Sequence, residues 1–223
     1  MVKNIKAVAF DIDGTLYPSV TFYLKLTGYV IKNIKFFMSF GKVRKVMHRT
    51  APLADFYEYQ SRLLAEELGV SSEEAKIKAN DIVYEGLKPY FKKTKTYPFV
   101  YDTIVALKSS GLKIGILSDF PPEQKGSIWG IRTLCDVCIG SEESGALKPS
   151  KYPFGILCQK LELKPEEILY VGNSKKYDIL GAKNAGMKTA YILKGWRKIF
   201  NIPLKEADFS FRNYRQLRNI VLN

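Results

Sequence analysis

Residues 5–15 read IKAVAFDIDGT, and this stretch sets the fold. Its four apolar residues, Ala7–Phe10, have no polar residue among them and match the length of a strand that is buried on both faces. Two carboxylates, Asp11 and Asp13, follow at once, and then Gly14. The stretch therefore predicts a central strand that ends in an acidic turn.

Short apolar runs of the same kind recur along the chain. The segments between them carry helical signals, such as a proline pair at the start or a glycine at the end. This alternation is typical of an α/β fold with a parallel sheet. The further strands are expected at Ile114–Leu117, Val137–Ile139, Ile168–Val171 and Thr189–Leu193, and the helices at Val100–Ser109, Pro121–Leu134 and Asp178–Ala185.

The connection between the first two strands is too long for one crossover. Its later half has apolar residues at helical spacing from Phe56 to Leu64, a stop at Gly69, and then Ser71 and Glu74 arranged as a capping box. We therefore predict an all-helical subdomain over residues 18–97, inserted into a core made of residues 1–17 and 98–223.

Length and composition exclude several classes of protein. The chain has 223 residues and 46% hydrophobic residues, which excludes a disordered chain. Its apolar runs are too short to span a bilayer, and the N-terminus lacks the apolar stretch of a signal peptide. Three cysteines cannot all pair with one another. We expect a soluble, cytoplasmic protein without transmembrane segments or disulfides.

The formal charge of +13 is unevenly distributed. Residues 14–54 hold seven basic residues and no acidic one, and residues 188–223 carry a net charge of +6. Such fields favour anionic partners, which include phosphorylated metabolites, nucleic acid and membrane surfaces. A solvated basic face that keeps the protein soluble is the plainer alternative, and there is no firm sequence signal for nucleic acid.

Polar residues stand directly after the predicted strands, where parallel sheets bind their ligands. Asp11 and Asp13 leave the first strand on the same side, so both carboxylates face one pocket and require a counterion. Oxygen ligands favour a hard divalent cation, by default Mg²⁺. The other residues at these strand ends are Gly14, Thr15, Ser118, Asp119, Lys148, Asn173 and Asp178.

These residue types together describe a phosphoryl-transfer site. Gly14 permits a tight turn whose N–H groups point at an anion, and the hydroxyls of Thr15 and Ser118 are hydrogen-bond donors. Lys148 adds a positive charge, and Asp178 brings a third carboxylate to the same edge.

In order and spacing, the segments resemble the four motifs of the haloacid dehalogenase (HAD) superfamily. They are DIDGT at residues 11–15, LSD at 117–119, LKP at 147–149, and GNS with an aspartate further on at residues 172–178. The resemblance spans the whole chain and implies a Rossmann-like three-layer core. The helical insertion resembles the C1 cap of that family, which closes over small substrates, so it implies a phosphatase acting on a small phosphorylated metabolite.

The resemblance also assigns roles to the residues. Asp11 would be the nucleophile that forms an aspartyl-phosphate, and Asp13 would protonate the leaving oxygen and then activate water. Lys148 would hold Asp11 and offset charge in the transition state. The phosphate of the substrate would be bound by Gly14, Thr15, Ser118 and Asp119.

The same resemblance implies that Mg²⁺ is held by Asp11, the main-chain carbonyl of Asp13 and the acidic end of the fourth motif, Asp178. Asn173 departs from the family pattern, because most phosphatases of the family have aspartate there. Its neutral oxygen is expected to bind Mg²⁺ more weakly unless Asp178 moves in. Tyr177, where the family often has asparagine, is a second departure.

Two other functions stay open at this stage. One is a metal-independent 2-haloacid dehalogenase-type hydrolase that uses Asp11, although the dehalogenating members generally lack a carboxylate where this chain has Asp13. The other is a catalytically weak family member whose basic cap and tail bind an anionic polymer or a membrane. The substrate and the oligomeric state are open as well.

Some residues favour structural roles. His48 has no nucleophile beside it in the sequence and is interpreted as a surface position of the cap. Cys135 and Cys138 flank a predicted strand and have no second pair, which argues against zinc. Residues 29–49 place apolar side chains on one face with lysines between them, which fits a packed cap helix or a helix for a membrane surface or partner.

Overall fold

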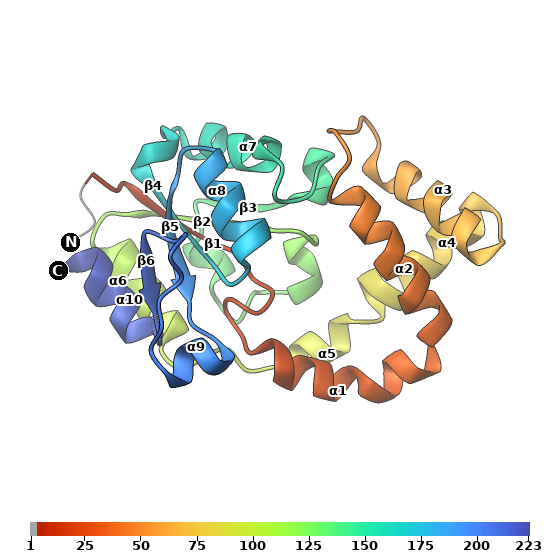
Figure 1. The fold of residues 1–223 in the computed structure, drawn as a ribbon, viewed down its shortest axis with the longest axis horizontal. Helices are drawn as coiled ribbons and strands as arrows, with labels where there is room; N and C mark the ends of the chain where they lie inside the picture. Colours follow the sequence, from red (N-terminus) through yellow and green to blue (C-terminus); the bar gives the residue numbers. More distant parts are fainter. Residues whose placement is uncertain (1–3) are drawn as a thin grey trace.

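The computed structural model describes residues 4–223 and consists of an α/β core with helices inserted after the first strand (Figure 1). The core is a six-stranded, all-parallel sheet with the order β3-β2-β1-β4-β5-β6. The predicted Rossmann-like sheet is therefore confirmed. The strands are β1 (Ala7–Phe10), β2 (Lys113–Ser118), β3 (Val137–Gly140), β4 (Ile168–Gly172), β5 (Lys188–Ile192) and β6 (Phe209–Phe211).

The register of the central strands places the four motifs together. β1 lies between β2 and β4, and Phe10 pairs with Ile116 on one side and Val171 on the other. Because the strands are parallel, the residues that follow them leave the sheet at one edge. Asp11, Ser118 and Asn173 reach this edge from three neighbouring strands.

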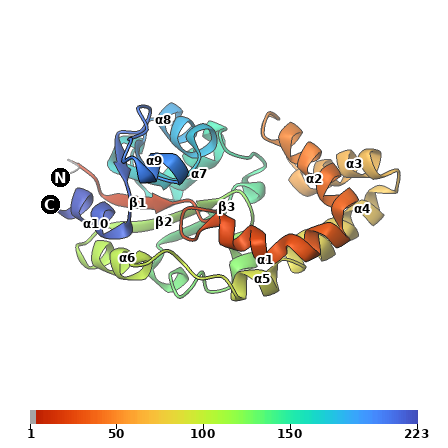
Figure 2. The ribbon, with the colours of Figure 1, turned by 60° about the horizontal axis from the view of Figure 1, so that its bottom comes forward.

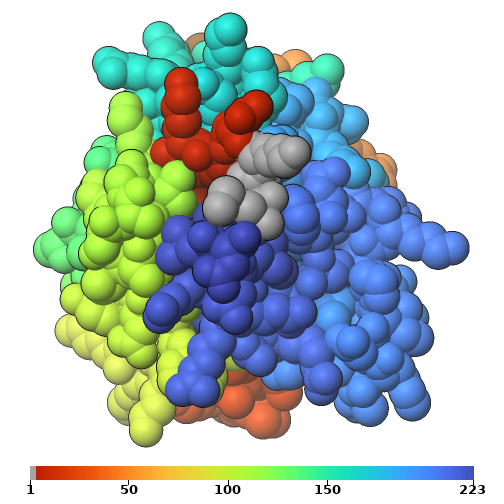
Figure 3. All heavy atoms as spheres, turned by 90° about the vertical axis from the view of Figure 1, so that its left-hand side faces the viewer, coloured from red at the N-terminus to blue at the C-terminus, as the bar shows by residue number. Residues whose placement is uncertain are grey.

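Helices cover both faces of the sheet and make three layers. α6 (Val100–Ser109) and α10 (Tyr214–Leu222) pack on the face that carries Val8 and Phe10. α7 (Lys151–Leu161) and α8 (Gly181–Asn184) cover the other face. Figure 3 looks onto the end opposite the inserted helices and shows α10 in dark blue, with green α6 at its side. A short α9 (Gly195–Ile199) follows β5.

The segment between β1 and α6 contains only helices among its regular elements, and Figure 2 shows them to one side of the core. Ser71 accepts the Glu74 N–H at the start of α4, and Gly69 ends α3 in the left-handed conformation, as the sequence predicts. The boundaries 18–97 stay a prediction, and residues 1–3 of the predicted core lie outside the described residues. The elements are α1 (Ser19–Lys32), α2 (Ile34–Met47), α3 (Phe56–Leu68), α4 (Ser72–Ala79), a π-helix (Asn80–Glu85) and α5 (Lys88–Lys92).

Residues 29–49 form no single helix, because α1 ends at Lys32 and α2 begins at Ile34. Phe36 and Phe40 of α2 are buried, so one face packs inside the protein. Ile31 and Met38 are exposed. Within residues 4–223, no helix has the length and apolar character needed to cross a bilayer.

One expected helix was wrong, and two other elements differ in detail from the sequence analysis. Residues 121–134 form two 3₁₀ turns, Pro122–Lys125 and Arg132–Leu134, because Gly126 and Gly130 take positive φ angles that end a helix. The last predicted core helix begins as a π-helix, Lys175–Leu180, before α8. β6 was missed because its three residues are too short to give an apolar pattern.

Candidate active site

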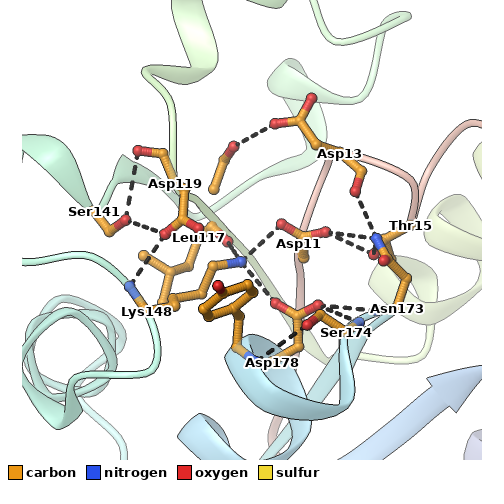
Figure 4. Close-up of polar contacts among 12 residues, drawn as sticks. Asp11, Asp13, Thr15, Leu117, Asp119, Ser141, Lys148, Asn173, Ser174 and Asp178 are labelled. Carbon is orange, nitrogen blue, oxygen red and sulfur yellow. Dashed lines mark hydrogen bonds and ion pairs between the residues drawn. The ribbon is translucent and has the colours of Figure 1, made fainter. Parts of the chain in front are cut away.

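Asp11 and Lys148 form the centre of the site (Figure 4). Asp11 follows the last residue of β1 at the edge of the sheet, and Lys148 Nζ lies 2.8 Å from Oδ1 of Asp11. The same ammonium lies 2.7 Å from Oδ1 of Asp178. All three side chains are almost completely buried. One cation thus bridges two carboxylates that come from different strand ends.

Burial sets the electrostatics of this trio. Loss of solvation raises the pKa of Asp11 to about 7, even though the Lys148 ammonium favours the ionised carboxylate. The neighbouring carboxylates of Asp178 and Asp13 raise it further. Burial alone would lower the pKa of Lys148, but the two carboxylates outweigh it and hold that pKa well above its ordinary value. Lys148 therefore stays charged.

Asp178 is held from both sides. Its Oδ1 binds Lys148, and its Oδ2 accepts the backbone N–H groups of Asn173 and Ser174 at 3.0 and 2.8 Å. Gly172 is required beside it, since a Cβ there would lie 2.3 Å from the Cβ of Asp178. Asp178 therefore fixes Lys148 and the turn after β4 rather than pointing into open space.

Oδ2 of Asp11 faces the turn that follows β1. The Thr15 hydroxyl donates to it at 2.7 Å, so Thr15 orients the carboxylate. Gly14 has φ +81°, and a Cβ on it would lie 2.2 Å from Ser19 Oγ, so the turn accepts only glycine. The Asn173 side-chain amide donates to both Asp11 Oδ2 and the main-chain carbonyl of Asp13.

The oxygens at the end of β1 and in the turn after it form a candidate cation site. Asp11 Oδ2, the Asp13 carbonyl and Thr15 Oγ1 converge on Asn173 Nδ2 at 3.3, 2.5 and 3.0 Å. An amide N–H₂ is partly positive, and oxygen donors around one positive point are the surroundings that Mg²⁺ prefers. The set contains one carboxylate oxygen, and within residues 4–223 no three His, Cys, Asp or Glu side chains gather as a metal cluster.

Two hydroxyl donors and one ammonium group surround the side chain of Asp13. The Tyr17 hydroxyl donates to its Oδ1 at 2.6 Å, and the hydroxyl of Ser118 donates to its Oδ2 at 3.2 Å. The ammonium of Lys125, whose side chain is fully buried, lies 3.1 Å from Oδ2. Burial and the negative charge of Asp13 raise the pKa of Tyr17, so its proton stays on the phenol. These groups hold the carboxylate of Asp13 beside Asp11.

Asp119 lies in the same area but does not contact Asp11. Its Oδ1 accepts the hydroxyl of Ser141 at 2.7 Å and the backbone N–H of Lys148 at 3.1 Å. These bonds tie the loop that carries Lys148 to the end of β2. The cation of Lys148 is the main favourable charge and lowers the pKa of Asp119 despite its burial.

Several residues of the site had no motif to reveal them. Lys125 and Tyr17 reach Asp13 from a 3₁₀ turn and from the start of the insertion, and only the structure places them there. Tyr170 donates to the Leu117 carbonyl beneath Lys148. Lys194 approaches Gly14, and burial lowers its pKa to about 8. A strand was predicted at Thr189–Leu193, but Lys194, which follows it, belongs to none of the four motifs.

The inserted helices are joined to the core by polar and aromatic contacts. His48 was expected at the cap surface, and this was wrong: its Nδ1 lies 2.6 Å from the Lys148 carbonyl, and its ring stacks on Tyr177 at 4.3 Å. Arg44 of α2 forms a buried ion pair with Glu142 of the core. Tyr177, a departure from the family pattern, therefore has a structural partner in the insertion.

The three cysteines are free thiols. Cys135 and Cys138 are half-buried, and Cys158 is buried in α7.

Comparison with known proteins identifies the family. A family model described as haloacid dehalogenase-like hydrolase matches residues 5–186, which is most of the chain. The chain therefore belongs to the haloacid dehalogenase-like hydrolases, and the resemblance of its four motifs to this superfamily is confirmed.

The curated relatives are phosphatases. The chain is 30% identical over 229 residues to glyceraldehyde 3-phosphate phosphatase of Methanocaldococcus jannaschii, covering 98% of both chains. It is 26% identical to phosphoglycolate phosphatase of Vibrio vulnificus, covering 99% of this chain and 97% of the relative. These similarities make the protein a hydrolase related to phosphatases.

Solved structures share the fold. A HAD phosphatase from Thermococcus onnurineus superposes with a TM-score of 0.64 at 24% identity, covering 97% of both chains. The L-2-haloacid dehalogenase of Xanthobacter autotrophicus with covalently bound chloropropionic acid gives the same TM-score at 21% identity, covering 97% of this chain and 98% of that one. At a TM-score of 0.64, the fold is shared with both a phosphatase and a dehalogenase.

Proposed function

We propose that the protein is a Mg²⁺-dependent phosphatase that hydrolyses a small phosphorylated metabolite through an aspartyl-phosphate on Asp11. The observation that carries this proposal is the pair of carboxylates at one sheet edge. Asp11 is fixed by Lys148 and Thr15, and Asp13 stands next to it with its own set of donors. The phosphatase names of the curated relatives support the same choice.

In the first half-reaction, a carboxylate oxygen of Asp11 attacks phosphorus, and the bond from phosphorus to the ester oxygen breaks. The leaving alcohol takes a proton from Asp13. Lys148 touches Asp11 and offsets negative charge that builds up at this edge. Ser118 and the N–H group of Gly14 would bind phosphoryl oxygens, with Thr15 orienting Asp11 through its hydroxyl and Asp119 holding the loop behind them.

In the second half-reaction, Asp13 takes a proton from water, and the oxygen of that water attacks phosphorus. The bond to Asp11 breaks, which releases inorganic phosphate and restores the carboxylate. The ammonium of Lys125, 3.1 Å from Oδ2 of Asp13, holds this carboxylate in place for the step. Tyr17 and Ser118 keep the carboxylate of Asp13 directed toward the site.

Mg²⁺ would be held by Asp11, the main-chain carbonyl of Asp13 and Asn173, whose amide would present its oxygen in place of Nδ2, with Asp178 behind them. When bound, it would neutralise phosphoryl oxygens as a Lewis acid. A cytoplasmic location stays a prediction, as does the absence of a nucleic-acid partner.

The test compares two substrates. We expect Mg²⁺-dependent phosphate release from p-nitrophenyl phosphate and no chloride release from 2-chloropropionate. Asp11→Asn and Asp13→Asn should each abolish phosphate release while leaving the thermal midpoint near that of the wild type. Chloride release without Mg²⁺ would show a dehalogenase-type hydrolase instead. Salt-sensitive binding of an anionic polymer that survives Asp11→Asn, without turnover of either substrate, would favour a binding protein.

A further inference from the structure

A cavity of about 480 Å³ lies between the inserted helices and the core, and the carboxylate of Asp13 lies at its wall. α1 and α2 form one side of it, and residues 83–91 form another. The core contributes Asp119 and Phe120, which follow β2. Because Asp13 is the group that would protonate the leaving oxygen, this cavity is where the rest of the substrate would extend.

The lining of the cavity is mostly aromatic and aliphatic. Rings from α1, α2, α5 and the loop after β2 surround it, and Leu26, Val30 and Leu87 fill the spaces between them. A leaving group in contact with this lining gains by burying apolar surface. The rings are those of Phe22, Phe37, Phe40, Phe91 and Phe120.

Some polar groups of the lining are engaged within the protein. The hydroxyl of Tyr17 is bonded to Asp13, and the amide nitrogen of Gln124 is bonded to the Val83 carbonyl. The hydroxyls of Ser19 and Tyr23 also line the cavity and have no partner among the described residues, and Oε1 of Gln124 is a buried acceptor without a partner. A leaving group with several hydroxyl or carbonyl groups would find only these few partners in exchange for the water that it loses.

The lining also disfavours an anionic leaving group. Nη1 of Arg44 is paired with the Glu142 carboxylate and bonded to Gln60, so the charge of Arg44 is balanced within the protein. His48 has its pKa lowered by burial and is neutral at pH 7. The carboxylates of Asp13 and Asp119 repel a second negative charge. A carboxylate on the substrate would therefore find no free cation among the described residues of this lining.

We propose that the natural substrate is the monophosphate ester of an apolar alcohol, alkyl or aryl, whose hydrocarbon part fills this cavity. The proposal rests on the proposed phosphatase function and narrows its substrate class. The proposed substrate class differs from the substrates in the names of the relatives. Those substrates, glyceraldehyde 3-phosphate and phosphoglycolate, have short polar leaving groups.

The expected effect can be measured with n-alkyl phosphates from ethyl to octyl. Each methylene that enters the cavity should raise kcat/KM about fourfold, since burying a CH₂ contributes about 0.8 kcal/mol. The increase should stop when the cavity is full. Phosphoglycolate should be a poorer substrate than butyl phosphate, although both have a short leaving group.

Two glycines offer a matched pair of variants. Gly41 of α2 lines the cavity, and a Cβ on it meets no atom within 4 Å. Gly28 of α1 has equally open surroundings but is not part of the lining. Gly41→Phe should reduce kcat/KM for octyl phosphate at least tenfold while changing ethyl phosphate little. Gly28→Phe should change neither, and thermal unfolding checks that both variants fold.

A second readout does not need turnover. Calorimetric binding of ethyl- and octylphosphonate, which cannot be hydrolysed at a P–O–C bond, should show tighter binding of the longer chain and loss of that preference in Gly41→Phe. Hydrolysis of all esters with kcat/KM flat or falling along the series would overturn the inference and leave the phosphatase function intact. Chain-length-dependent binding without turnover of any ester would support the cavity and overturn the proposed function.

Discussion

Replacing Lys148 with methionine removes the positive charge that two buried carboxylates share. The ammonium lies 2.8 Å from Asp11 and 2.7 Å from Asp178. At an effective dielectric constant of about 20, each pair attracts by about 6 kcal/mol before the cost of desolvation. Removing one partner of a buried ion pair typically costs about 3–5 kcal/mol. We expect a loss of free energy of unfolding in that range for Lys148→Met.

Activity should fall as well. Asp11 would lose its fixed position and the charge that offsets the transition state, and the loss of one such group typically lowers kcat about 10²–10³-fold. Urea denaturation gives the free energy of unfolding, and phosphate release gives kcat. Lys108→Met is the matched control, because the ion pair of Lys108 with Asp136 is partly exposed and should contribute at most about 1 kcal/mol.

The stability of Lys148→Met should also respond to pH. Without the cation, the folded state binds protons on its buried carboxylates more readily than the unfolded chain does, so its stability rises as the pH falls. The deficit relative to the wild type should therefore shrink between pH 8 and pH 5. A variant that unfolds within about 1 kcal/mol of the wild type at pH 8, or that retains more than a tenth of its kcat, would refute the reasoning.

Three further outcomes are expected. Arg44→Met should cost about 3–5 kcal/mol of unfolding free energy in urea, because it leaves Glu142 buried without a partner, and Arg44→Met combined with Glu142→Gln should recover part of it; an unchanged single variant would contradict this. Burial lowers the pKa of His48, so the unfolded state binds a proton that the folded state rejects, and this side chain subtracts from the stability of the wild type as the pH falls below the ordinary histidine value of about 6.5. Denaturation curves at pH 7.5 and 5.5 should therefore show His48→Gln gaining stability relative to the wild type at the lower pH, and an equal difference at both pH values would count against burial as the cause. Asn173→Asp should bind Mg²⁺ more tightly in a calorimetric titration, since it adds a charged oxygen beside Asp11 Oδ2, and an unchanged affinity would mean that residue 173 is not a ligand.

The sequence predicts the core better than the cap. An unbroken apolar run such as Ala7–Phe10 has one reasonable structure, a buried strand, and parallel strands bring the residues that follow them to one edge whatever the loops do. Asp11, Ser118, Lys148 and Asp178 could therefore be expected near one another before their contacts were known.

Positions that depend on long-range packing could not be predicted in this way. His48 lies on a polar stretch whose sequence neighbours give no hint of the Lys148 carbonyl, 100 residues away in the chain. Lys125 carries no local signal either, because a buried lysine is recognisable only through its partner Asp13. The prediction of a helix over residues 121–134 was wrong, because the proline pair at its start does not reveal that Gly126 takes a positive φ.

Trapping the intermediate on Asp11 is the measurement that decides between nucleophilic catalysis and any other use of this site. Borohydride reduces an acyl phosphate to an alcohol, so quenching the enzyme with borohydride during turnover of p-nitrophenyl phosphate should convert Asp11 to homoserine. Mass spectrometry of the peptide that contains residue 11 should find homoserine only when both substrate and Mg²⁺ are present. Continued phosphate release with an unmodified Asp11, or with the label on another carboxylate, would contradict the assignment of Asp11 as the nucleophile.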